Sequence, residues 1–180
     1  MPTYVVLPNS TILDLTSYRG NGALPTEGTP LTSFSFNLAL VLERANDPSG
    51  LLTADWASRQ KQLAALGSDE LWTLYGADPA KYNDVLARLA ELGISTVDQI
   101  DAVNGYVSSP ESRTIWVQVN ETNFTTLFGQ GATLLRGDGP EGTLTFWKGD
   151  LSLPDSLAAA GVKGVVFDTG LFGQEVGDRK

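Results

Sequence analysis

Alternating hydrophobic and polar positions give the clearest structural signal in the chain. Between Thr32 and Leu42, an apolar side chain stands at every second position, namely at Phe34, Phe36, Leu38, Leu40 and Leu42. Successive side chains of a strand point to opposite faces, so this period of two predicts a strand with one fully buried face. The turn-forming segment Asn46-Asp47-Pro48-Ser49-Gly50 predicts the end of this element.

Helical spacing follows, and it predicts three helices between Thr53 and Gly93. The first helix is capped by Thr53, runs to Leu66 and has Trp56, Leu63 and Leu66 on its inward side. Ser68 caps the second, which ends at Gly76. Asp78 caps the third, with Pro79 at the first helical position. The apolar residues of this third helix are spaced i, i+3, i+4 and i+7: Tyr82, Val85, Leu86 and Leu89.

The rest of the chain predicts mostly strands. Strands are expected at 94–102 and 114–119. A short helix capped by Asn120 follows, and then a hairpin formed by 132–135 and 143–147. From Thr143 to Asp168 the order is a strand, a short helical turn near Pro154 and a final strand. This order predicts an α+β fold, a ferredoxin-like antiparallel sheet with helices packed on one face.

One domain is expected at residues 32–168, with an N-terminal arm at 1–31 and a C-terminal tail at 169–180. The arm is rich in Pro, Gly, Thr and Ser, and its segments 4–7 and 11–15 are candidate short strands. The sequence shows no basic region followed by an apolar core at its start, so no signal peptide is visible.

The composition of the chain disfavours some classes of partner and excludes several classes of active site. The formal net charge is -9 and the sequence pI is about 4.3, which disfavours nucleic acid and acidic membrane surfaces as partners. The chain contains no histidine and no cysteine, which excludes Ser-His-Asp and Cys-His catalysis, disulfides, and imidazole or thiolate metal sites. We therefore expect no catalytic residue, no metal and no cofactor.

Five segments in a fixed order resemble the activation prodomain of the sedolisins, the serine-carboxyl peptidases that include the kumamolisin-like enzymes. They are SFSFNLALVLER, DELWTLYG, DPAKYNDVLARLAELGI, ETNFTTLFG and WKGDLSLPDSL, and together they span most of residues 32–168. Each segment alone is common, and the specificity lies in their order. The loop at 102–112 is longer than is usual in that family. The Gly-Thr-Ser motif of the peptidase is absent, and no carboxylate matches its Glu-Asp pair.

The resemblance implies a non-enzymatic protein: the propeptide of a secreted or periplasmic, acid-activated peptidase. Such a propeptide acts as an intramolecular chaperone and blocks the cleft of its partner, the cognate peptidase catalytic domain. Two alternatives stay open. The first is a stand-alone protease inhibitor or protein-binding module of the same fold. The second is a small ligand-binding or enzymatic α+β domain.

Four residues are candidates for the partner interface: Trp116, Gln118, Thr145 and Trp147. They fall on the polar-looking side of their strands, where an uncovered sheet face is expected. Tryptophan buries a large area at low entropic cost, so the two indoles are candidate anchors for a partner. The alternative is that each tryptophan is covered by the N-terminal arm or packs at a sheet edge.

The tail supplies a second candidate site, formed by Asp168, Thr169, Gly170, Leu171, Phe172 and Gly173. An extended segment can satisfy its backbone groups by pairing with the edges of a peptidase cleft, with Leu171 and Phe172 in specificity pockets. The alternative is simple disorder beyond the domain. The excess of carboxylates is either a solvated surface or an acid trigger that acts through pairs with basic groups of the enzyme.

Overall fold

The alternating segment forms the central strand of the protein. The computed structural model describes residues 2–7, 12–14, 27–97, 106–139 and 142–167. In it, β4 (Ser35–Leu42) lies between β5 (Thr114–Asn120) and β9 (Val162–Phe167), and both neighbours run antiparallel to it. The predicted buried face is confirmed, because four side chains of β4 are at most 1% exposed: Phe36, Leu38, Leu40 and Leu42.

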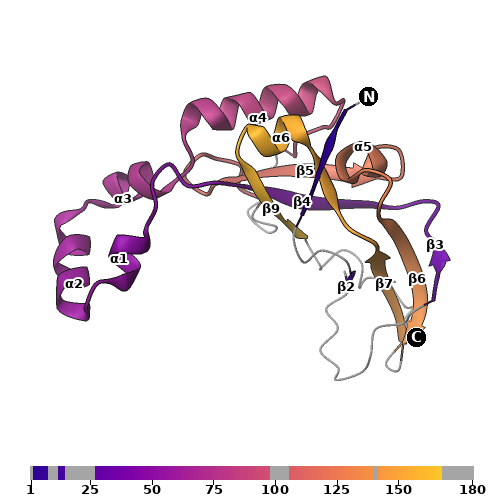
Figure 1. Cartoon of the computed structure of the whole chain (residues 1–180), viewed down its shortest axis with the longest axis horizontal. Coiled ribbons are helices and arrows are strands. Elements are labelled where there is room, and N and C mark those ends of the chain that lie inside the picture. The colour runs from indigo at the N-terminus through magenta and orange to yellow at the C-terminus, as the bar shows by residue number, and fades with distance from the viewer. Residues whose placement is uncertain (1, 8–11, 15–26, 98–105, 140–141, 168–180) are drawn as a thin grey trace, which may run out of the picture.

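Two helices cover this buried face, α4 (Pro79–Glu91) and α6 (Asp155–Ala159), as Figure 1 shows. The predicted start of α4 is confirmed, since the Asp78 carboxylate accepts a hydrogen bond from the Ala80 backbone N–H at 2.7 Å. A third helix, α5 (Phe124–Phe128), joins the same core through Leu127 and Phe128, both fully buried. Gly129 ends it with a φ of 70°.

The remaining strands form two further antiparallel sheets. One has the order β2-β7-β6-β3, made of β2 (Ile12–Asp14), β7 (Gly142–Lys148), β6 (Thr133–Gly139) and β3 (Thr29–Pro30). The other pairs β1 (Tyr4–Val6) with β8 (Ser152–Pro154). The short strands expected within 4–7 and 11–15 are therefore present, and each adds to a strand from the C-terminal half.

Three helices extend away from this body and form the helical arm, residues 49–75 (Figure 1). They are α1 (Ser49–Thr53), α2 (Trp56–Ala65) and α3 (Ser68–Tyr75). The helix predicted between Thr53 and Leu66 is present as α2, but its predicted cap is corrected. The chain is extended at Ala54, and Asp55 instead of Thr53 caps α2 by accepting a hydrogen bond from the Ser58 N–H at 3.0 Å.

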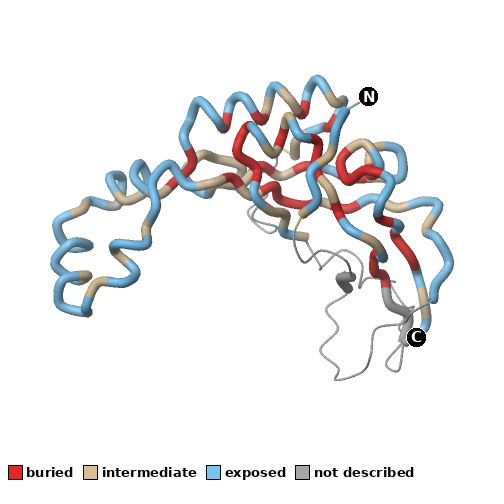
Figure 2. Tube along the Cα trace, in the orientation of Figure 1, coloured by how far each residue is buried: buried red, intermediate tan, exposed pale blue. Residues whose placement is uncertain are grey.

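The expected inward side of this helix is also corrected. Trp56 is 69% exposed and Leu63 is 40% exposed, and Figure 2 shows the arm almost entirely in the exposed colour. Helical spacing places these side chains on one side of α2, and both stay largely exposed there.

The mixed α+β class expected from the sequence is confirmed by the helices and antiparallel sheets together. The strand expected at 94–102 is reduced in the described part to an isolated bridge between Thr96 and Val117, and residues 98–102 lie outside it. The ferredoxin-like arrangement of the strands stays a prediction.

Candidate partner interface

The side of the β5-β4-β9 sheet that faces away from α4 and α6 is the candidate interface, and we call it the open face. Register aligns three apolar residues across it, since Ala39 of β4 lies opposite Trp116 of β5 and opposite Val166 of β9. Val166 is 53% exposed, whereas Ala39 in the middle of the row is buried. The open face therefore presents an apolar row that ends in an exposed valine.

Trp116 lies at the β5 end of this row and is half-buried. Its indole packs against the ring of Tyr106, with centroids 4.7 Å apart and planes at 57°. Its backbone N–H donates to the Ser108 hydroxyl at 2.9 Å, and its carbonyl accepts from the Val97 N–H at 2.9 Å. Trp116 thus contacts a neighbouring segment at the sheet edge, and part of its surface stays accessible.

Gln118 is exposed on the same face, opposite Asn37 of β4. Its backbone N–H donates to the Ser95 carbonyl at 3.1 Å, and its own carbonyl accepts from the Asn123 side-chain amide at 3.0 Å. These two bonds, both on the outer side of β5, hold the backbone of Gln118 in place, so its side chain is presented from a fixed position. It adds a polar group beside the apolar row.

Thr145 and Trp147 do not lie on an open face, which corrects the sequence-based expectation. Thr145 is 8% exposed and Trp147 is 1% exposed. The reason is that β7 is an inner strand of its sheet and carries buried side chains on both faces. Trp147 pairs in register with Leu13 of β2 and Leu134 of β6, and its indole packs against Phe167, so it belongs to the main core.

The candidate cleft-binding tail, Asp168 to Gly173, lies outside the described residues. Phe167, immediately before it, is the last residue of β9 and packs against Phe36, Phe128 and Trp147. The structure therefore fixes the point from which the tail begins, at the junction of the two larger sheets.

A charge cluster that sequence reasoning missed lies where β4, α4 and β9 meet. The Glu43 carboxylate accepts hydrogen bonds from Lys81, near the start of α4, and from Lys163 of β9 at 3.2 Å. These bonds hold the pKa of Glu43 below its ordinary value, and the bond from Lys81 has the larger effect. The three residues are far apart in the sequence, so no local pattern indicates their contact.

The described residues contain no group of Asp and Glu side chains arranged to hold a metal ion. In the same part of the chain, no helix combines the length and the apolar character needed to cross a membrane. No protein-family model matches the chain, and no curated protein matches its sequence.

Proposed function

We propose that this chain is the propeptide of a secreted, acid-activated serine-carboxyl peptidase of the sedolisin type. It assists folding of the catalytic domain and blocks its cleft until it is shed. The observation that carries the proposal is the half-covered sheet, with helices on one face and the row Trp116, Ala39 and Val166 on the other.

The partly accessible apolar row supports a protein partner over a small ligand. A sheet face with an exposed valine and an accessible indole is a flat surface, and flat apolar surfaces bind other folded proteins. A half-buried tryptophan already ordered by Tyr106 loses little conformational freedom on binding. The catalytic domain of the peptidase is the partner that the resemblance implies for this face.

The strand order also supports the proposal. Placing β4 between β5 and β9, with a bridge from Thr96 to Val117 on the outer side of β5, agrees with a ferredoxin-like order of four strands. In such a prodomain β9 leads directly into the tail, so Leu171 and Phe172 would follow the sheet that contacts the enzyme. The tail then enters the cleft as an extended segment.

Inhibition of a sedolisin-type peptidase by the purified chain tests the proposal. We expect inhibition near neutral pH that is lost in acid, with subtilisin-type and pepsin-type enzymes unaffected. Replacing Val166 by Asp places a charge in the apolar row and should weaken inhibition at least about tenfold. The matched control is Val6→Asp, since Val6 is 55% exposed on β1.

Failure to inhibit any sedolisin-type peptidase, with the fold intact, would remove the proposal. If the chain does inhibit such a peptidase, the reading frame beyond Lys180 separates the two related functions. A peptidase domain in frame supports the propeptide, and a stop codon supports the stand-alone inhibitor.

A further inference from the structure

The helical arm has no core of its own. Among its residues with described side chains, none is buried. Five large apolar side chains of the arm are at least 36% exposed: Leu52, Trp56, Leu63, Trp72 and Leu74. Helices are ordinarily stabilised by burying one apolar side against another element. An arm of this kind is a surface available to another molecule.

Hydrogen bonds nevertheless fix the base of the arm to the body. The Arg44 guanidinium donates to the Tyr75 carbonyl at 3.0 Å, and the Asn46 amide donates to the Leu74 carbonyl at 2.8 Å. The Gly76 carbonyl accepts from the Ala45 N–H at 2.7 Å, while the Ala77 N–H donates to the Pro110 carbonyl at 2.8 Å. The C-terminal end of α3 is therefore positioned before any partner arrives.

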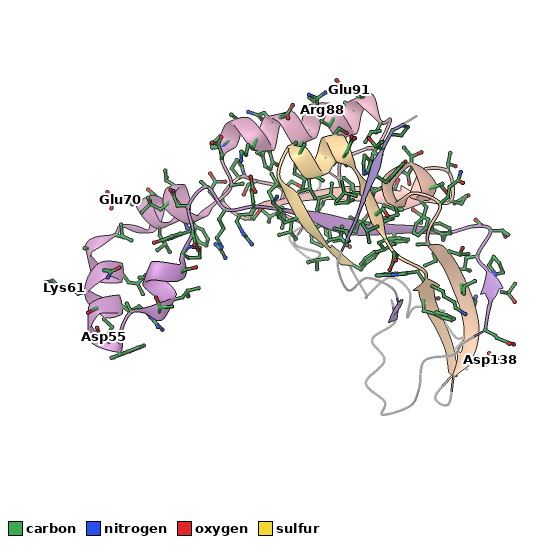
Figure 3. All side chains as sticks on the ribbon, viewed as in Figure 1. Asp55, Lys61, Glu70, Arg88, Glu91 and Asp138 are labelled. Atoms are coloured by element: carbon green, nitrogen blue, oxygen red, sulfur yellow. The ribbon has the colours of Figure 1, made fainter. Side chains whose placement is uncertain are left out.

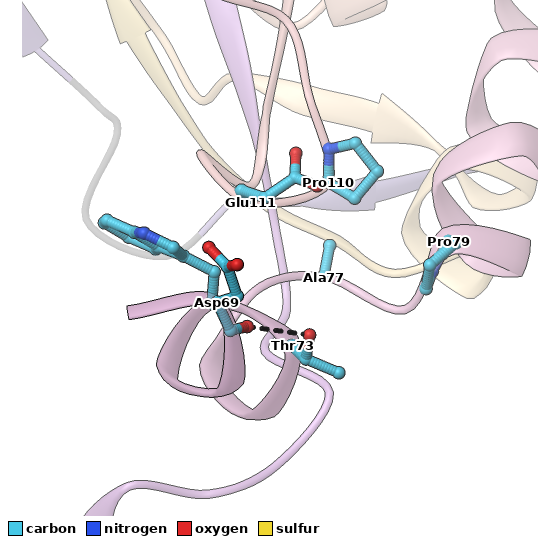
Figure 4. A pocket seen from close by; sticks show the side chains of 7 residues that line it. Asp69, Thr73, Ala77, Pro79, Pro110 and Glu111 are labelled. Atoms are coloured by element: carbon cyan, nitrogen blue, oxygen red, sulfur yellow. Dashed lines mark hydrogen bonds between the residues drawn. The ribbon is translucent and has the colours of Figure 1, made fainter. Parts of the chain in front are cut away.

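A cavity of about 240 Å³ opens between α3 and the turn before β5, and we call it the root pocket. Figure 4 shows Asp69 and Thr73 of α3 on one side and Pro110 and Glu111 on the other. Its lining is Asp69, Trp72, Thr73, Ala77, Pro79, Pro110 and Glu111. The Trp72 side chain is 51% exposed, so an aromatic surface is available beside two carboxylates.

The charges of the root pocket are of one sign. None of its lining residues is basic. Across the described residues, no ion pair reaches the carboxylate of Asp69 or of Glu111. Figure 3 shows Lys61 farther out on the arm, on α2. The pocket thus combines an aromatic wall, apolar proline and alanine surface, and two unpaired anions.

This combination matches an arginine side chain. A guanidinium stacks on an indole, forms paired hydrogen bonds with a carboxylate, and has an apolar stem that proline and alanine can cover. A phosphate or another anion is repelled by both carboxylates. We propose that the root pocket binds an arginine of the partner peptidase and forms a second contact, separate from the open face. The identity of this partner rests on the proposed function above.

The first test uses the full chain and a small probe. The four tryptophan indole N–H signals are followed by NMR during titration with N-acetyl-arginine methylamide. The citrulline analogue is the matched control, because it has nearly the same shape without the charge. We expect the Trp72 signal to shift with arginine and not with citrulline, and the exposed Trp56 signal to stay in place. Equal shifts with both probes, or no shift of Trp72, would overturn the proposal.

The second test measures inhibition of the peptidase. The double variant Asp69→Asn/Glu111→Gln and the single variant Trp72→Ala should each inhibit at least about tenfold more weakly than the unaltered chain. The controls are Glu91→Gln, at the far end of α4 from the arm (Figure 3), and Trp56→Ala. Both should stay within about twofold.

The two proposals fail differently. If the double variant inhibits as strongly as the unaltered chain and has the same free energy of unfolding, the root pocket does not bind the peptidase. The proposed propeptide function is unaffected by that result. If the chain inhibits no sedolisin-type peptidase, the proposed function fails, and the arginine titration still decides whether the pocket binds a guanidinium.

Discussion

The indole of Trp147 lies against the ring of Phe167, with centroids 4.7 Å apart and planes at 37°. Trp147 belongs to β7 of the four-stranded sheet and Phe167 to β9 of the three-stranded sheet. Phe167 also packs against Phe36 at 5.6 Å and Phe128 at 6.1 Å. This aromatic group joins the hairpin of the second sheet to the core beneath α4 and α6.

Replacing Trp147 by Ala should lower the free energy of unfolding by about 3–5 kcal/mol, because it leaves a large cavity between the sheets. Trp116→Ala should cost less than half as much, since Trp116 is only half-buried. Urea unfolding monitored by circular dichroism measures both. Equal costs for the two variants would contradict the assignment of Trp147 to the core and Trp116 to the surface.

Replacing Gly76 by Ala should destabilise the base of the arm. An added Cβ would lie 2.5 Å from the Trp72 carbonyl oxygen and 3.0 Å from that of Pro110, and neither backbone atom can move freely. We expect a loss of about 1–3 kcal/mol, measured by urea unfolding. The matched control is Gly50→Ala in α1, where nothing lies within 4 Å. That change should be neutral or raise stability by up to about 1 kcal/mol.

Glu43 should make folding stability fall in acid. Its pKa lies below the ordinary value of 4.5 in the folded chain, mainly through the hydrogen bond from Lys81. Its contribution to stability is therefore fully present above pH 4.5 and is lost as pH falls through the lowered pKa. Glu43→Gln should flatten the decline of unfolding free energy with falling pH, and Lys81→Gln should do the same. An unchanged slope in both variants would contradict this origin.

Replacing Asp78 by Ala should cost about 1 kcal/mol, because the carboxylate caps α4 through the Ala80 N–H. The control is Asp84→Ala on the same helix. Asp84 is exposed and pairs with Arg88 at 3.4 Å, and such surface pairs contribute little. Thermal and urea unfolding of the two variants should rank them in this order, and a larger loss for Asp84→Ala would argue against the cap.

Local patterns predicted the elements whose stability is decided locally. The period of two in β4 and the Asp78-Pro79 start of α4 are properties of a few neighbouring residues, and the structure has both. The spacing of Trp56, Leu63 and Leu66 in the helical arm also predicted a buried side, yet Trp56 is exposed. Spacing shows which side chains share a face, but the element that covers the face comes from elsewhere in the chain.

In the candidate interface, too, the sequence pattern does not show which side chains are covered. Trp116 and Trp147 have the same position in their alternating strands, and only Trp116 stays accessible. The difference arises because Trp147 lies on the inner strand β7 and packs against Phe167, whereas Trp116 lies on the edge strand β5. Likewise, the root pocket joins Trp72 to Glu111 across a long stretch of sequence, so no local motif could indicate it.

The exposed apolar surface of the helical arm has a consequence for how the isolated chain behaves at different pH values. At neutral pH the net charge of -9 makes chains repel one another, which opposes association through Leu52, Trp56 and Trp72. Near the pI of about 4.3 this repulsion vanishes while the apolar area is unchanged. The free chain should therefore self-associate in acid. Under the propeptide function proposed above, acid is also the condition in which the chain leaves its enzyme, so aggregation would oppose its return.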